Sequence, residues 1–134
     1  MREKHLFDKA LRAAESAAIL LDAGDTDGAC DRAYYAMFSA ACAALLAEGH
    51  EPGKTHKGIL SAVSANLIKD GPLPKEMGRL LKRAETLRYV ADYHERPVGI
   101  EDAREMVDNA KIFLDAVQSS FGLGPAGSPA RPKP

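Results

Sequence analysis

Residues 33–47 read AYYAMFSAACAALLA, and Ser39 is the only strongly polar side chain among them. Alanine and leucine dominate the stretch, and no glycine or proline interrupts it, which is typical of a helix. A helix that is apolar all round is a buried helix. A membrane span needs about 18 or more consecutive apolar residues. Asp31, Arg32 and Glu48 bound the stretch below that length, so it predicts the central helix of a soluble α-helical domain.

The composition is that of one ordinary domain. The chain has 134 residues, of which 46% are hydrophobic and 28% charged. A net charge of −1 argues against a protein that coats DNA or binds a membrane surface, because both should be strongly basic. Cys30 and Cys42 would lie about 18 Å apart on one helix, too far for a disulfide. Met1 leads directly into a charged segment, so we expect a cytoplasmic protein with reduced thiols, no signal peptide and no membrane span.

Four further helices are expected around the central one, because apolar side chains recur at helical spacing on both sides of it. A turn, GDTDG at residues 24–28, offers an Asp or Thr to cap the central helix, and Thr55 is the expected N-cap of the next helix. The four helices are expected at about residues 4–22, 56–69, 74–94 and 100–121. Their predicted inward side chains are Leu6, Ala10, Ala13, Ala17, Leu20 and Leu21; Ile59, Leu60, Val63 and Leu67; Met77, Leu80, Leu81, Ala84, Leu87 and Ala91; and Ile100, Ala103, Val107, Ala110, Leu114, Val117 and Phe121.

No segment alternates with period two, so no sheet is expected. The fold class is therefore all-α, an up-and-down bundle of about five helices over residues 1–121. From residue 122 the chain reads GLGPAGSPARPKP, which is too rich in glycine and proline to pack a core and predicts a disordered tail.

The sequence offers no pattern typical of a metal or phosphate-loop site. The four histidines are spread along the chain, and neither H-E-x-x-H nor C-x-x-C occurs. The spacing of a phosphate-binding loop and the G-x-S-x-G nucleophile turn are also missing. We therefore predict no metal and no cofactor.

Arg88 is the most informative residue of the fourth helix, because helical spacing places it within the apolar stripe. A buried arginine is costly unless it is paired. One explanation is structural: an internal salt bridge with Asp92, or a side chain whose charged end reaches water. The other is a functional cleft or dimer interface in which Arg88 faces a phosphate. The spacing leaves both open.

The opposite face of this helix carries cations followed by aromatic side chains. Such a face can follow a nucleic-acid backbone and stack bases. A solvated helix face is the simpler explanation, because Glu76 and Glu85 dilute the charge. The residues concerned are Lys75, Arg79, Lys82, Arg83, Tyr89 and Tyr93.

Two histidines fall at helix ends. His94 follows Arg88 by six residues, and an imidazole there can act as a general acid or base near neutral pH. An arginine that holds a phosphate and a histidine that moves a proton are a minimal set for RNA cleavage without a metal. His56 and Lys57 follow the expected N-cap, where anions are favoured. They are expected to help in phosphate or interface contacts, with a simple surface pair as the alternative.

Three stretches of the chain resemble HEPN domain proteins (higher eukaryotes and prokaryotes nucleotide-binding). DRAYYAMFSAACAALL, residues 31–46, resembles the second helix of the small prokaryotic branch encoded beside minimal nucleotidyltransferases. THKGI, residues 55–59, resembles the start of that branch's third helix, and RYVADY, residues 88–93, resembles its fourth-helix signature. Order, spacing and the five-helix count agree, so the resemblance covers about residues 3–120.

The resemblance implies a helical bundle that forms a homodimer through the faces carrying the arginine motif. Many members are endoribonucleases with an R-x4-6-H motif, which Arg88 and His94 satisfy. Arg88 would hold the scissile phosphate of an RNA, and His94 would act as acid or base. The candidate supporting residues are Asp92, Tyr89, Tyr93, His56 and Lys57.

Members paired with a nucleotidyltransferase are toxins that this partner neutralises, in some cases by transferring AMP to a tyrosine. The chain departs from the usual pattern at Ser39, Tyr89 and Arg96, and these departures bear on activity rather than on fold. One alternative is therefore a non-catalytic HEPN module that binds nucleotide or scaffolds the nucleotidyltransferase. An unrelated bundle that binds other proteins is a third hypothesis.

Overall fold

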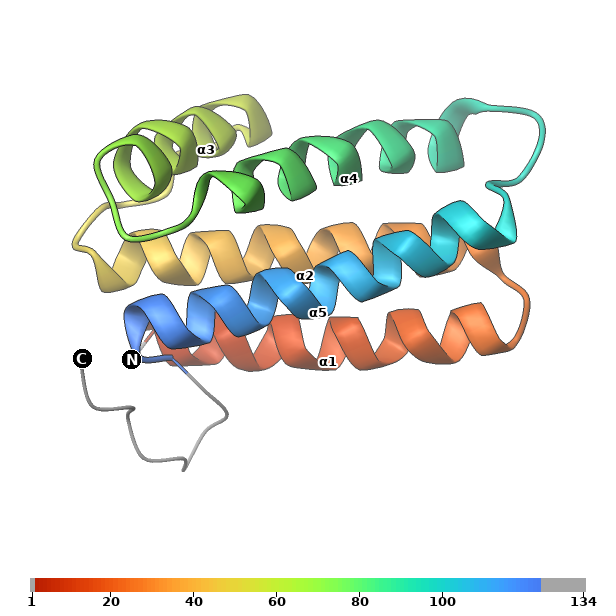
Figure 1. Ribbon diagram of the computed structural model, residues 1–134, viewed down its shortest axis with the longest axis horizontal. Coiled ribbons are helices and arrows are strands. Elements are labelled where there is room, and N and C mark those ends of the chain that lie inside the picture. Colours follow the sequence, from red (N-terminus) through yellow and green to blue (C-terminus); the bar gives the residue numbers. More distant parts are fainter. Residues whose placement is uncertain (1, 124–134) are drawn as a thin grey trace.

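The computed structural model describes residues 2–123, and within them the chain forms helices and no strand (Figure 1). This confirms the predicted all-α, up-and-down bundle. The helices are α1 (Arg2–Asp22), α2 (Thr26–Ala47), α3 (His56–Ala62), the π-helix η1 (Val63–Lys69), α4 (Lys75–Tyr93) and α5 (Ile100–Phe121). No helix among residues 2–123 is long and apolar enough to cross a membrane. Most of the predicted tail, residues 124–134, lies outside the described residues.

The alanine-rich helix α2 is the centre of the bundle, as predicted. It packs against α1, α4, α5 and η1, and Figure 1 shows α5 crossing in front of it. Within residues 36–45 every side chain is buried except Phe38, which is partly buried. Helix α1 faces α2 with alanines of its own, so two helices with small side chains approach closely. The bulk of the core comes from fully buried side chains that include Phe7, Met37, Leu45, Met106 and Phe113.

Side-chain caps fix where α2 and α3 begin. The Asp25 carboxylate accepts a hydrogen bond from the Gly28 N–H at 2.9 Å, and the Thr55 hydroxyl oxygen accepts one from the Gly58 N–H at 3.0 Å. Both caps agree with the sequence prediction. Asp27 Oδ1 also accepts a hydrogen bond from the Val98 N–H at 2.9 Å, which ties the connection between α4 and α5 to the first turn of α2.

Three details differ from the sequence prediction. The expected third helix divides into α3 and η1, although Ile59, Val63 and Leu67 are buried as expected. Ile100 is 45% exposed, because the neighbouring Val98 takes the buried position at the start of α5. The packed domain also continues past Phe121. Gly122 adopts a left-handed conformation (φ +67°) that ends α5 and returns Leu123 to the core.

The close packing around α2 predicts that extra volume there is destabilising. Ala40 is fully buried, so Ala40→Leu should lower the free energy of unfolding by about 1–3 kcal/mol. Ala47→Leu is the matched control, because Ala47 is exposed at the end of the same helix. Urea unfolding followed by circular dichroism measures both variants. Equal stability of the two would contradict the close packing of α2.

Candidate functional site

A pocket of about 360 Å³ opens where α2, α3 and α4 meet, and we call it the Arg88 pocket. It unites the three stretches of sequence on which the HEPN resemblance rests. Helix α2 presents one face to it at helical spacing, α3 contributes its first residue, and α4 contributes two residues one turn apart. The lining residues are Asp31, Arg32, Tyr34, Tyr35, Phe38, His56, Arg88 and Asp92.

Arg88 lies at the edge of this pocket with its side chain 42% exposed. Arg88 is thus only partly inward, and its pairing with Asp92 agrees with the structural explanation offered by the sequence. Arg88 Nε is 3.5 Å from Asp92 Oδ2, and the guanidinium carbon is 5.3 Å from the centroid of the Tyr34 ring. A cation over an aromatic face is attracted to it, so a carboxylate and a ring together orient Arg88.

Asp31 is the unusual charged group of the pocket. Its Oδ1 atom is buried and has no hydrogen-bond partner among residues 2–123. Burial, followed by a hydrogen bond and charge repulsion with Asp92, raises the pKa of the Asp31 carboxyl to about 6, and the Arg88 charge opposes this rise. Asp31 can therefore exchange a proton near neutral pH. Within residues 2–123, no group of three or more His, Cys, Asp or Glu side chains is placed to hold a metal ion.

An aromatic cluster brings α3 onto α2. The His56 ring stacks on Phe38 with centroids 4.4 Å apart, and Tyr34 lies 5.9 Å from Phe38 and 6.3 Å from His56. His56 is the first residue of α3, directly after the Thr55 cap, so the cap determines where the imidazole lies. Lys57 does not line the Arg88 pocket. It lines a neighbouring groove of about 660 Å³ between α3, η1 and α4, which His56 also lines.

The remaining predicted site residues lie outside the pocket. Tyr89 and Tyr93 are 61% and 70% exposed, with ring centroids 4.8 Å apart, and line a separate hollow that Arg88 also borders. His94 caps the C-terminus of α4, is exposed, and lines neither hollow. Within one chain, the structure therefore brings Arg88, Asp92 and His56 together but leaves His94 outside.

Sequence reasoning missed Asp31, Tyr34 and Phe38 as site residues. The sequence spacing does group them, because residues three, four and seven apart lie on one face of a helix. The surrounding run of alanines made this face of α2 look like uniform core. A charged residue just before an apolar run, followed by aromatics at helical spacing, is the pattern that could have identified the pocket.

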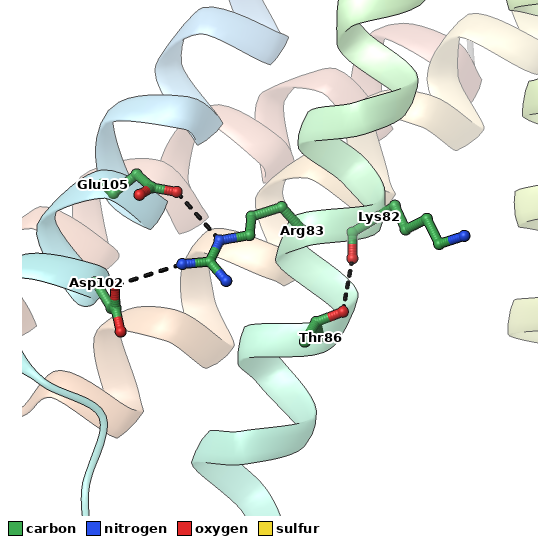
Figure 2. Close-up of polar contacts among 5 residues, drawn as sticks. All are labelled: Lys82, Arg83, Thr86, Asp102 and Glu105. Carbon is green, nitrogen blue, oxygen red and sulfur yellow. Dashed lines mark hydrogen bonds and ion pairs between the residues drawn. The ribbon is translucent and has the colours of Figure 1, made fainter.

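Two of the four cations on the predicted basic face of α4, Arg79 and Arg83, are paired with carboxylates. Figure 2 shows Arg83 reaching from α4 to α5, with Nε 3.2 Å from Glu105 and Nη2 3.4 Å from Asp102. Arg79 pairs with Glu76 on α4 itself at 3.2 Å. These side chains are well exposed, so the pairs contribute little stability. They favour a solvated helix face over a surface that follows a nucleic-acid backbone.

The HEPN domain family model matches residues 3–120. The chain belongs to the HEPN family. A UPF0332 protein of Gloeobacter violaceus is 40% identical over 114 residues, which cover 84% of this chain and 90% of that protein. A UPF0332 protein of Thermotoga maritima is 33% identical over 105 residues, covering 78% of this chain and 79% of that one.

A third relative carries a functional name, and a solved structure shares the fold. The Methanocaldococcus jannaschii protein named "Putative toxin MJ0605" is 30% identical over 90 residues, covering 67% of this chain and 66% of that protein. The crystal structure of TT1696 from Thermus thermophilus superimposes with a TM-score of 0.74 at 24% identity, covering 89% of this chain and 98% of the other. The family resemblance found in the sequence is thus confirmed for this HEPN protein.

Asp31 should make the stability of this HEPN protein depend on pH. An unfolded Asp has a pKa of about 3.9, whereas the pKa of Asp31 is about 6 in the folded protein. Ionised Asp31 therefore costs folding free energy, a cost that grows from pH 4 to 6 and is constant above. Asp31→Asn should raise the unfolding temperature at pH 8, and the gain should disappear near pH 4.

Thermal unfolding between pH 4 and pH 8 measures this effect. Asp108→Asn is the matched control, because Asp108 is exposed on α5 and lies outside the pocket. A gain from Asp31→Asn that is the same at every pH would mean that Asp31 does not titrate in this range.

Proposed function

We propose that this HEPN protein is the toxin of a toxin–antitoxin pair and cleaves RNA without a metal. The observation that carries the proposal is the position of Arg88, half-exposed at the edge of a pocket and oriented by Asp92 and Tyr34. Family membership and the relative named as a putative toxin support it. The substrate class is single-stranded RNA, because unstacked bases and exposed phosphates can enter an open pocket.

Arg88 would bind the scissile phosphate. A guanidinium has five N–H donors in a planar fork that suits phosphate oxygens. Asp92 approaches Nε, and no ion pair or hydrogen bond occupies the terminal Nη groups within residues 2–123. The Nη groups can therefore meet a phosphate while Asp92 keeps the fork in place. A donor that is fixed before the reaction stabilises charge developing on the phosphate at little reorganisation cost.

His94 would act as an acid or base in a homodimer. R-x5-H places His94 at the end of the helix that carries Arg88, but outside the Arg88 pocket of the same chain. We infer that two copies pack through their α4 faces and combine their Arg88 and His94 residues in one cleft. The exposed Tyr89–Tyr93 pair supports this arrangement, because an interface can cover exposed aromatic rings. A nucleotidyltransferase partner would neutralise the toxin.

A second candidate function follows from the charges of the pocket. When both carboxyls are ionised, Asp31 and Asp92 balance the charges of Arg32 and Arg88, and the Arg88–Asp92 pair is formed without any ligand. This observation favours a non-catalytic HEPN module in which the pair is structural and the protein scaffolds the nucleotidyltransferase.

RNA cleavage by purified variants tests the first function against the second. Arg88→Ala should reduce the cleavage rate by about 10²–10³-fold, the typical cost of removing one charge-stabilising donor. His94→Ala should reduce it by about 10²–10⁴-fold, the typical contribution of a general acid or base. A chelator should have no effect. Arg104→Ala, an exposed arginine on α5, is the matched control.

Circular dichroism of Arg88→Ala separates lost chemistry from lost folding, since this variant leaves Asp92 without its partner. Expression of the chain alone and with the neighbouring gene should show growth arrest and RNA damage only when the chain is alone. Intact RNA in both cases, with a folded wild-type protein that cleaves nothing, would favour the scaffold.

The assembly can be measured directly. The wild-type chain should sediment as a homodimer at micromolar concentration. A double charge substitution, Tyr89→Glu with Tyr93→Glu, should give a monomer, because it buries like charges in the α4 interface. The same pair of substitutions at the exposed Ile19 and Ile112, on α1 and α5, should leave the dimer intact. A wild-type monomer would refute the dimer.

A further inference from the structure

The proposed RNA cleavage requires two proton transfers, and within one chain the Arg88 pocket contains a single imidazole, that of His56. The 2′-hydroxyl oxygen attacks the phosphorus and must lose its proton. The bond from phosphorus to the 5′ oxygen breaks, and that oxygen must gain a proton. The products are a 2′,3′-cyclic phosphate and a 5′-hydroxyl, with no change of oxidation state. The attacking and leaving oxygens lie on opposite sides of the phosphorus, so one side chain serves them poorly.

We infer that His56 is a second proton-transfer residue, placed with Arg88 in the Arg88 pocket. This inference rests on the proposed function and adds a catalytic residue to it. His56 lies in the same pocket as the guanidinium that would hold the phosphate, whereas His94 of the same chain does not. In the proposed dimer, His56 would serve one oxygen and a His94 imidazole the other.

The surroundings of His56 suit this role. Phe38 covers one face of the ring at 4.4 Å between centroids, which restricts the orientation of the imidazole. The residue is nevertheless exposed, so both a substrate and a proton can reach it. The Thr55 cap holds the backbone of α3 at this point. A positioned imidazole of this kind contributes typically about 10²–10⁴-fold to a rate.

Other groups of the pocket fit the role less well. Burial raises the pKa of the Tyr34 hydroxyl, so it stays protonated at neutral pH and cannot accept a proton. Asp31 titrates in the right range, but its Oδ1 atom is buried. The charged and titratable groups that border His56 through its two hollows are Asp31, Arg32, Tyr34 and Tyr35 on α2, Lys57 on α3, and Lys82, Glu85, Arg88 and Asp92 on α4.

The variant His56→Phe tests the inference, because phenylalanine keeps the stack on Phe38 but cannot carry a proton. His56→Phe should bind a single-stranded RNA oligonucleotide as the wild type does and cleave it about 10²–10⁴-fold more slowly. His56→Ala should lose a similar factor. His50→Phe is the matched control, because His50 is exposed in the loop before α3 and lines neither hollow.

The outcomes separate the inference from the proposed function. Wild-type cleavage with an unimpaired His56→Phe would overturn the inference alone. A loss in His56→Ala that His56→Phe restores would also overturn it, since stacking would then be the whole role. A folded wild-type protein that cleaves no RNA would overturn the nuclease function, and the inference with it.

Discussion

The structure depends on burying α2, a helix whose inward and outward faces are both mostly apolar. Such a helix is stable in water only when other helices surround it. Its many alanines allow α1 to pack closely, and larger side chains from α1 and α5 fill the remaining space. The N-terminal half of α2 differs from this pattern. There, Asp31, Arg32 and Tyr35 interrupt the buried surface, and α3 and α4 cover it only in part. The Arg88 pocket lies at this incompletely covered end.

The charged groups of the Arg88 pocket interact directly with one another. Arg88 is held by Asp92 and Tyr34, Asp92 repels Asp31, and Asp31 responds by favouring its protonated form. A fixed guanidinium beside a carboxyl that titrates near neutral pH is costly for folding and useful for chemistry. Without Arg88, the Asp31 and Asp92 carboxylates would repel each other with no Arg88 charge to oppose the repulsion. Arg88 therefore offsets carboxylate charge in the pocket, and in the proposed function the same side chain would also bind the phosphate.

Much of the fold followed from sequence because helix formation depends on local spacing and on capping residues. Thr55 and Asp25 marked helix starts, and the apolar runs marked what is buried. Ile100 was wrongly predicted to be buried, because helical spacing within α5 cannot show how far the neighbouring helices extend. The site was harder to predict. The Arg88–Asp92 pair and His56 could be identified from the sequence. Their meeting with Asp31, Tyr34 and Phe38 depends on how α3 and α4 lie across α2. That arrangement is a tertiary property with no local signature, and the motif spacing likewise could not show that His94 does not line the Arg88 pocket.

The position of His94 outside the Arg88 pocket links the proposed chemistry to the proposed homodimer. If the cleft needs an imidazole on each side of the phosphorus, a single chain offers Arg88 and His56 in one pocket, while His94 caps the C-terminus of α4 outside it. In the proposed homodimer, the joining of two α4 helices would bring the His94 of one copy to a phosphate held by the Arg88 of the other. Any protein or modification that covers Tyr89 and Tyr93 would then oppose both dimer formation and substrate access at once. A partner could therefore silence the site without ever entering the Arg88 pocket.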